Sequence, residues 1–583
     1  MGYTEDDTAR VTDSREGGRS GWGAPLRAWS ETGLQWLVLA SLVVFILWPI
    51  AAVLRVGLTI DGSPTLELIY EALTDSRGLL WNSIFVGVLA TTLTLFIAVN
   101  IAFWATRSGS RLSKPLFGLL LLTMISPPFV TSLSYVMLFG RRGLITHQLL
   151  GLRLDPYGWH GVVLMQGIGF TSLAAILLIG VLRGIDGRLE EASLDLGASR
   201  TSTIARVTLP LLIPGIAATS LITFVESLAD FGTPIIIGGR FTVLATQAYL
   251  NFIGISNLPV AAGMAILLLI PSLIAFLLYR HFMGRLTFYT RGTSVTGDPM
   301  GLPRWLLVVT GAVTLAFSAF VTLQYVTILF GAFATTWGVD FTPTLRHIQG
   351  LPSTAFASLG RSIRFAMFTA VVGSMLGMVV AYLLERRRFW GRSGLDFIAT
   401  LPFMIPGPFL GIGYALAFRD APLALTGTLA IVLLNMIYRQ LPVATKAGAA
   451  VLSQADPEVE DAARDLGASE SRIIKDVVFP QLKPAFLVGF VNTFTASMVT
   501  IGAIIFLITP GTKVATIELF GAVRGGHIGV AAVLANIIML VTLTVNVTFS
   551  WLLLRRSREE RGVFDVPATR AIDQVVQRAD GGR

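Results

Sequence analysis

Long apolar runs recur from one end of this chain to the other, and they decide what it can fold into. A helix needs about 20 apolar residues to cross the roughly 30 Å hydrocarbon layer of a membrane, and each run is about that long. The runs are apolar on every side, whereas the strands of a membrane barrel alternate apolar and polar residues. Of the 583 residues, 53% are hydrophobic and only 14% are charged. The sequence therefore predicts an all-α, polytopic membrane protein.

The number and the flanks of these runs set the expected topology. We expect twelve membrane-spanning helices, an even number that puts both termini on one side. Arginine and lysine gather in the loops after the second, sixth and eighth runs, and short loops with such an excess face the cytoplasm. Both termini are then cytoplasmic, as polar tails at 1–30, expected to be disordered, and at 557–583. The expected spans are 34–55, 80–104, 115–139, 160–182, 213–237, 258–279, 304–330, 362–384, 395–418, 425–444, 485–508 and 530–554.

A polar segment occurs twice between the apolar runs. Its copies, 190–199 and 460–469, share an acidic start and the sequence Leu-Gly-Ala-Ser, and Pro210 and Pro480 follow them at the same interval. The glycine in each copy favours two short helices that meet at a left-handed residue. A polar element that recurs between membrane spans indicates a docking site, one for each half of the chain.

The apolar runs around the polar segments also match between the halves. Ser83 corresponds to Ser362, and Tyr135 corresponds to Tyr414. We therefore expect two parallel repeats of six helices each, related by an axis along the membrane normal, with a substrate pathway between them. The expected boundaries are 31–285 for the first repeat, 286–303 for a linker and 304–556 for the second repeat.

The polar segments resemble the EAA loop of bacterial ATP-binding-cassette importer permeases. The first copy has Glu191, Ala192 and Gly197 at the family's spacing, whereas the second has Asp461 in place of the usual glutamate and Phe479 in place of the usual leucine. The resemblance implies a fold like that of type I importers, in the cytoplasmic membrane of a bacterium. The residues expected to contact the ATPase lie in loops 188–210 and 458–480 and are Glu190, Glu191, Ala192, Gly197, Leu209, Pro210, Glu460, Asp461, Ala462, Gly467 and Pro480.

The same resemblance implies the partners, and the residues themselves argue against several activities. It implies two copies of a separate ATPase subunit and a periplasmic or lipid-anchored solute-binding protein. The chain has no G-x-x-x-x-G-K-[ST] sequence, so we expect no enzyme activity and no cofactor here, with ATP and Mg²⁺ on the partner ATPase. It has no cysteine, and its five histidines lack metal-ligand spacing, so no metal site is expected. Its charge of +9 is not interleaved with aromatic residues, so we do not expect nucleic-acid binding.

The substrate is suggested by one stretch of the first half. Residues 226–234, Glu-Ser-Leu-Ala-Asp-Phe-Gly-Thr-Pro, resemble ferric iron importer permeases in particular. Related permeases for 2-aminoethylphosphonate, thiamine and polyamines share much of the pattern and remain alternatives. A secondary transporter driven by an ion gradient is the rival from another class, but it would need ionisable relays in both halves.

Four residues are candidates for the pathway. Glu226 and Asp230 lie one helical turn apart within an expected span, whereas the matching positions of the second half are Ala496 and Thr500. Buried carboxylates of this kind either attract a cation along the pathway or accept hydrogen bonds from helix ends, and the sequence does not decide between these roles. Tyr135 and Tyr414 each follow a proline-bearing stretch, where the chain either opens to a pathway or bends for packing.

Overall fold

The computed structural model describes residues 23–563, apart from 61–62, 128, 153–154, 255–256, 287–299, 388 and 390. Within this part of the chain the strands form only two short hairpins, so the all-α prediction is confirmed. The hairpins pair β1 (Thr59–Ile60) with β2 (Ser63–Pro64) and β3 (Ala334–Thr336) with β4 (Asp340–Pro343).

The first half contains helices α1 to α12 and three π-helical turns, and the second half contains helices α13 to α23, one π-helical turn (η6) and three 3₁₀ turns (η5, η7 and η8). Those of the first half are α1 (Gly23–Leu42), η1 (Val43–Leu47), α2 (Trp48–Gly57), α3 (Glu67–Arg107), α4 (Ser113–Ile125), α5 (Phe129–Phe139), η2 (Leu144–Leu149), α6 (Trp159–Arg183), α7 (Gly187–Asp195), α8 (Arg200–Thr203), η3 (Ile204–Thr208), α9 (Leu209–Ala229), α10 (Gly232–Ile237), α11 (Leu244–Ile253) and α12 (Leu258–Leu286). Those of the second half are α13 (Arg304–Gly331), α14 (Arg346–Gln349), α15 (Ser353–Arg386), α16 (Arg392–Thr400), η5 (Leu401–Phe403), α17 (Gly407–Ala417), α18 (Leu429–Leu452), α19 (Glu458–Asp465), α20 (Glu470–Ile473), η6 (Ile474–Val478), α21 (Phe479–Val499), η7 (Ile504–Phe506), η8 (Pro510–Thr512), α22 (Ala515–Arg524) and α23 (Ile528–Val563).

The helices extend past the expected boundaries of the tails. Because α1 begins at Gly23, residues 23–30 are helical and do not belong to a disordered tail. At the other end α23 continues to Val563, beyond the boundary expected at 556. Residues 1–22 and 564–583, and the linker except for its ends, lie outside the described residues.

Candidate membrane spans are of three kinds: long single helices, bent helix pairs, and the more polar helix α18. Nine helices of the described chain are long and apolar enough to cross a membrane, and two sharply bent helix pairs raise the number to eleven. The helix α18 packs between α15 and α21 as α6 packs between α3 and α9. The helix α18 therefore holds the equivalent place in the second half, but Arg439 and Lys446 make it more polar than the other candidate spans, and the twelfth span stays a prediction.

Two expected spans are bent pairs, and two others end early. The expected span 115–139 is α4 followed by α5 at 104°, and the expected span 395–418 is residues 392–403 followed by α17 at 111°. Pro127 and Pro406 stand at the bends, where proline removes a backbone donor and holds the preceding residue extended. The spans expected at 213–237 and 485–508 end as continuous helices at Ala229 and Val499.

The first helix of each half packs on the other half. The η1–α2 segment lies against α17 and α18, and α13 lies against α3 and α5. Hydrogen bonds fix both exchanges: the Tyr414 hydroxyl donates to the Phe45 carbonyl at 2.6 Å, and the hydroxyls of Ser126 and Tyr325 share a bond of 2.6 Å. The two halves are therefore interlocked.

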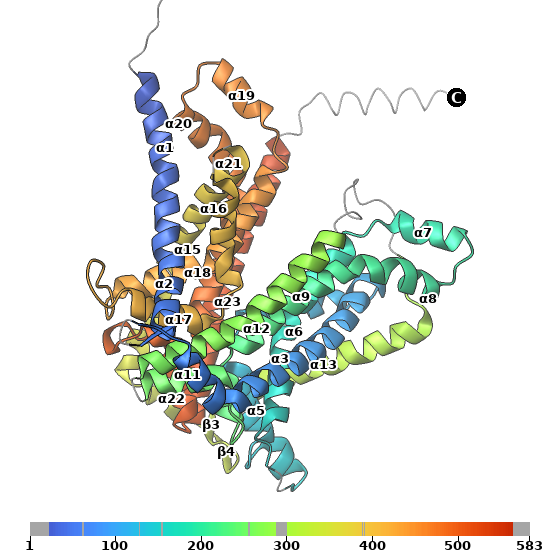
Figure 1. Ribbon diagram of the computed structural model, residues 1–583. Helices are drawn as coiled ribbons and strands as arrows, with labels where there is room; N and C mark the ends of the chain where they lie inside the picture. The colour runs from blue at the N-terminus through green and yellow to red at the C-terminus, as the bar shows by residue number, and fades with distance from the viewer. Residues whose placement is uncertain are drawn as a thin grey trace, which may run out of the picture.

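The hydrophobic core follows this arrangement. One buried cluster contains residues of both halves, among them Phe129, Phe231 and Phe520, and two further clusters fill one arm each. In Figure 1 the two arms diverge from the end that carries α11 and α22 toward the end that carries α7 and α19. The shared core thus joins the halves, while the tips of the arms stand apart.

Close packing between α15 and α18 yields a stability prediction. A Cβ on Gly377 would lie 3.0 Å from the backbone of Ala444 and Thr445, whereas one on Gly373 would lie 3.6 Å from its nearest neighbour, the Thr493 methyl group. We expect Gly377→Val to lower the free energy of unfolding by about 1–3 kcal/mol, because overpacking displaces backbone. Gly373→Ala is the matched control and should melt like the wild type in thermal unfolding of the purified protein. Equal melting of Gly377→Val and wild type would contradict the packing.

Candidate coupling site

The two repeated polar segments fold into the same structure. In each, a short helix ends at a glycine with φ of +84°, Gly197 between α7 and α8 and Gly467 between α19 and α20. The amide of Gly197 donates to the Leu194 carbonyl at 2.8 Å, and that of Gly467 donates to the Arg464 carbonyl at 2.9 Å. Left-handed backbone of this kind favours glycine, so the predicted role of both glycines in the turn is confirmed. Figure 1 shows both segments at the same end of the molecule, one at the tip of each arm.

A leucine projects from each turn into solvent. Leu196 is 89% exposed and Leu466 is 90% exposed, and each directly precedes its glycine. Each half thus presents one apolar side chain to solvent at the same place in its repeated segment. The sequence analysis missed these leucines, although both stand within the repeated Leu-Gly-Ala-Ser sequence.

The acidic residue that opens the first segment points inward. Glu190 is buried and pairs with Arg107, the last residue of α3, with side-chain exposures of 1% and 3%. Its carboxylate also accepts the Thr208 hydroxyl at 2.7 Å and the backbone amide of Met300 at 3.1 Å. These donors fix α7 to the end of α3, to η3 and to the described end of the linker.

The second segment repeats the ion pair with fewer additional hydrogen bonds to the glutamate. Glu460 accepts from Nε of Arg386 at 2.7 Å, and their side chains are 8% and 10% exposed. Arg386 also donates to the Ala455 carbonyl at 2.9 Å. The position of Thr208 is taken here by Val478, which has no hydroxyl to donate, so Glu460 depends more heavily on its arginine.

These ion pairs were available as a sequence signal. Arg107 lies 24 residues after Ser83, and Arg386 lies 24 residues after the equivalent Ser362. The arginines are therefore equivalent across the repeat, as are the two glutamates. Sequence reasoning used both arginines for topology alone and missed their pairing.

The other predicted contact residues face outward. Glu191, Ala192, Asp461 and Ala462 are exposed on α7 and α19, which we call the coupling helices, and Gly197 and Gly467 are exposed just after them. Leu209, Pro210 and Pro480 are exposed where the next span begins. Of the eleven predicted residues, only Glu190 and Glu460 are withdrawn from the surface. These two attach the loops to the helices, and the remaining nine are free to meet a partner.

A cluster of charges braces the second segment. Glu470 accepts from Arg464 at 2.9 Å and from Arg387 at 3.1 Å, and Arg464 also pairs with Asp461. Hydrogen bonding to Glu470, with the charges of both acids, raises the pKa of the Arg464 guanidinium. The first segment instead joins the hydroxyls of Ser193 and Thr203 at 2.9 Å. The two loops therefore share a backbone but differ in how they are held.

Each segment enters the membrane through a π-helical turn. These turns, η3 and η6, come just before Pro210 and Pro480. Proline has no amide hydrogen and its ring displaces the carbonyl four residues back, which favours one wider turn at that point. The turn recurs in both halves, so it is a regular structural feature of the repeated segment.

Asp230 has a structural role. One carboxylate oxygen accepts the amides of Gly232 at 2.9 Å and Thr233 at 3.1 Å, and so caps α10. The other accepts from the side chain of Gln166 at 3.0 Å, which is bonded in turn to Ser227 at 2.6 Å. This arrangement favours the helix-end role over a pathway role for Asp230.

Glu226 is placed differently. Its side chain is exposed although it lies within α9, and no hydrogen bond joins it to another described residue. The opposite charge that acts on it most strongly belongs to Arg439 of α18, in the other half. Arg439 is half-buried and donates to the Ile405 carbonyl at 3.4 Å. Arg439 thus lies within electrostatic reach of Glu226, and the sequence analysis did not connect the two residues.

Both tyrosine candidates are packed into the structure. Tyr135 is buried and donates to the Pro156 carbonyl at 2.6 Å. Tyr414 is buried and donates to the carbonyl of Phe45 in the exchanged first helix. Their hydroxyls are occupied in this way, which favours packing at the proline bends, so we leave them out of the pathway.

The buried ion pairs yield a prediction about the coupling loops. Glu190→Ala leaves the Arg107 charge buried without a partner, and we expect it to lower the free energy of unfolding by about 3–5 kcal/mol. Glu191→Ala, at an exposed position, should leave thermal unfolding unchanged. The double variant Arg107→Leu with Glu190→Leu should recover most of the lost stability, because no unpaired charge remains. Equal melting temperatures for Glu190→Ala and the wild type would contradict the ion pair.

Comparison with known proteins supports the duplication. The model of a family described as the binding-protein-dependent transport system inner membrane component matches residues 90–288 and again residues 373–558. These two matches contain the two coupling segments and correspond to the two expected repeats.

Relatives match along most of the chain. A ferric transport system permease protein of Actinobacillus pleuropneumoniae is 35% identical over 489 residues, which cover 81% of this chain and 70% of the relative. A putative ferric transport system permease protein of Haemophilus influenzae is 33% identical over 502 residues, covering 82% and 78%. A spermidine/putrescine transport system permease homolog of Mycoplasma genitalium is 30% identical over 220 residues, only 37% of this chain and 75% of the relative. The chain belongs to the family of binding-protein-dependent transport system inner membrane components and carries two copies of the family's domain in one polypeptide.

Proposed function

We propose that this chain is the permease subunit of an ATP-binding-cassette importer that carries ferric iron into the cell. The observation that carries the proposal is the pair of equivalent coupling loops at the tips of two arms, each presenting an exposed leucine. The names of two relatives that match over most of the chain support iron as the cargo. Permeases for 2-aminoethylphosphonate, thiamine or polyamines are the alternatives within the same class.

The proposed orientation places the loops in the cytoplasm. Two copies of an ATPase subunit, with ATP and Mg²⁺ bound to them, dock on loops 188–210 and 458–480. A solute-binding protein delivers the cargo at the opposite end, where β3 and β4 lie (Figure 1). Both termini are cytoplasmic, and the chain is a multi-pass protein of the bacterial inner membrane. The permease itself performs no hydrolysis.

The proposed mechanism is alternating access between the two halves. Closure of the ATPases on ATP brings the coupling loops together. The ion pairs Arg107–Glu190 and Arg386–Glu460 pass this movement to α3 and α15, so that the arms approach and the opposite end opens. Hydrolysis lets the arms separate again, as they stand in Figure 1.

Glu226 is the residue that we assign to the pathway. It is exposed within α9 without a hydrogen-bond partner among the described residues, and carboxylate oxygen suits a hard cation such as ferric ion. Arg439 opposite limits how long a cation remains there, since the two positive charges repel each other. Release is as necessary for transport as binding.

Uptake by the reconstituted system tests the function. With the permease, its ATPase and its solute-binding protein in liposomes, we expect accumulation of radioactive ferric iron only when ATP is present on the ATPase side. Glu226→Gln should reduce this uptake at least tenfold while leaving thermal unfolding unchanged. Asp230→Asn should instead lower the melting temperature, since it weakens the cap of α10. Uptake driven by a proton gradient without ATP would overturn the importer, and normal uptake by Glu226→Gln would remove it from the pathway.

The leucines at the loop tips test the docking and its stoichiometry. Native mass spectrometry should detect two ATPase copies on the wild-type permease and none on the double variant Leu196→Asp with Leu466→Asp, because a charge replaces the apolar contact. Leu149→Asp is the matched control: Leu149 is also exposed, but it lies in η2 beside the β3–β4 hairpin at the opposite end. Full ATPase binding by the double variant would show that the loops are not the docking site.

A further inference from the structure

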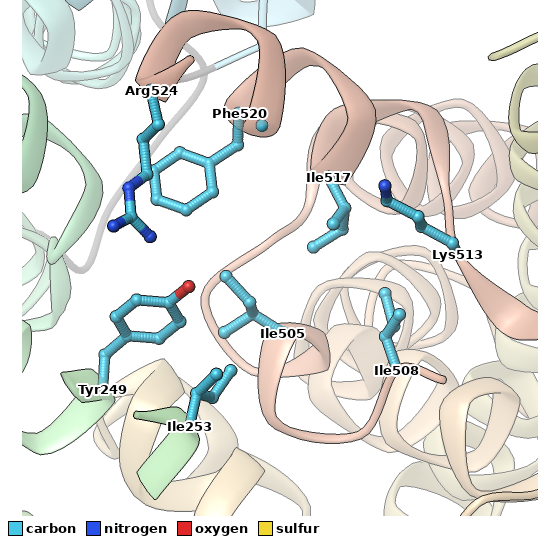
Figure 2. Close-up of a pocket in the computed structure, with 9 residues that line it drawn as sticks. Tyr249, Ile253, Ile505, Ile508, Lys513, Ile517, Phe520 and Arg524 are labelled. Carbon is cyan, nitrogen blue, oxygen red and sulfur yellow. The ribbon is translucent and has the colours of Figure 1, made fainter. Parts of the chain in front are cut away.

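A cavity lies between the two halves at the end opposite the coupling loops. Its volume is about 400 Å³, and it is lined by α11 of the first half and by η7, α22 and the loop residues Ile508 and Lys513 of the second (Figure 2). The helices α11 and α22 both lie at this end in Figure 1. The cavity is therefore at the mouth where, on the proposed function, cargo enters the permease.

The cavity lies on the axis that relates the halves. The first amide of α11, on Leu244, donates to the Ser83 hydroxyl at 2.8 Å, and that of α22, on Ala515, donates to the equivalent Ser362 hydroxyl at 2.8 Å. Counting from these bonds, Tyr249 is equivalent to Phe520, and Ile253 is equivalent to Arg524. All four residues line the cavity, and the rings of Tyr249 and Phe520 meet edge to face at 6.2 Å.

This symmetry is broken by two polar side chains. In the pair Tyr249 and Phe520, the polar residue belongs to the first half. In the pair Ile253 and Arg524, the polar residue belongs to the second half. Figure 2 shows the Tyr249 hydroxyl and the Arg524 guanidinium pointing into the same space from opposite sides of the cavity. Neither forms a hydrogen bond or an ion pair with another described residue, although Tyr249 is only 6% exposed. The Arg524 guanidinium lies over the Phe520 ring, 5.7 Å from its centroid.

The charges around the cavity favour an anion. Lys513 contributes a second positive charge at the far side and is paired with Glu518 at 2.9 Å, whereas no carboxylate is among the lining residues. A guanidinium presents a planar fork of donors that fits carboxylate or phosphate oxygens, and the Tyr249 hydroxyl adds a further donor. Ile505 and Ile508 form apolar walls beside these donors, and the cavity is open to solvent, where Arg524 is exposed. A bare ferric ion would meet one phenol oxygen and a net positive charge.

We propose that this cavity binds a small oxyanion through Arg524 and Tyr249. We further infer that ferric iron enters the permease as a complex with such an anion rather than as a bare ion. This second step rests on the proposed function. The positive charge at the cavity then attracts the complex. The anion accepts hydrogen bonds from Arg524 and Tyr249, which a metal ion cannot do.

Binding of radioactive citrate tests the site, because citrate carries the required oxyanions and keeps ferric ion in solution. The probe is added, with and without an equimolar amount of ferric ion, to the permease–ATPase complex in lipid nanodiscs. We expect saturable binding that weakens about tenfold in Tyr249→Phe and in Arg524→Ile, since each loses a donor to the anion. Each variant carries the residue that the other half has at that position, and Arg524→Gln is a second variant that keeps a polar side chain. Arg240→Gln, at an exposed position between α10 and α11, is the control and should bind like the wild type.

The two arms of the experiment separate the sources of the anion. Equal binding with and without iron would support a site for the oxyanion itself, and binding only with iron would support a site for the complex. Absence of saturable binding in both arms, or unchanged binding in the Tyr249 and Arg524 variants, would overturn the site. Iron uptake by the wild type is measured in parallel: citrate binding without iron uptake would refute the proposed cargo and leave the site intact.

Discussion

A buried arginine–glutamate pair in each half holds the coupling loop to the membrane domain, and the proposed function depends on it. Arg107 and Arg386 end the long helices α3 and α15, and Glu190 and Glu460 lie in the first turns of α7 and α19. Burial makes each charge costly without its partner, so the loop and the helix end are expected to move as one piece. The exposed leucines at the loop tips add an apolar surface on which a partner can act.

The rest of the fold determines how a movement of the coupling loops is transmitted to the two arms. The halves share a core at one end, and each gives its first helix to the other. At the other end the arms stand apart (Figure 1). Movement applied to the tips is therefore expected to turn the arms about the shared core and to reach the cavity on the axis near Tyr249 and Arg524. The two halves share a backbone arrangement but differ in side chains at equivalent positions, Glu226 against Ala496 and Tyr249 against Phe520, so the proposed pathway between them is asymmetric.

Much of this arrangement was predictable from the sequence. Apolar run length predicted the helices because the hydrocarbon layer fixes it, and the repeated glycines predicted the turns because left-handed backbone is costly for other residues. The inward and outward faces of the coupling helices were not predictable. Glu190 and Glu191 are neighbours of the same type, and only the position of Arg107, far away in sequence, decides which one is buried. Likewise, the cap of α10 that occupies Asp230 depends on where α9 ends, which apolarity alone does not indicate.

The most direct test of this account is the distance between the two arms with and without nucleotide. The chain has no cysteine, so spin labels can be placed cleanly at Arg183→Cys and Ser453→Cys, exposed positions at the ends of α6 and α18 beside the coupling loops. In the complex with ATPase, electron paramagnetic resonance should measure a shorter distance when ATP binds. The shortening should be lost when Glu190 and Glu460 are both replaced by glutamine, although the ATPase remains bound. An unchanged distance on ATP binding in the unsubstituted loops, or the same shortening without the two glutamates, would contradict the account.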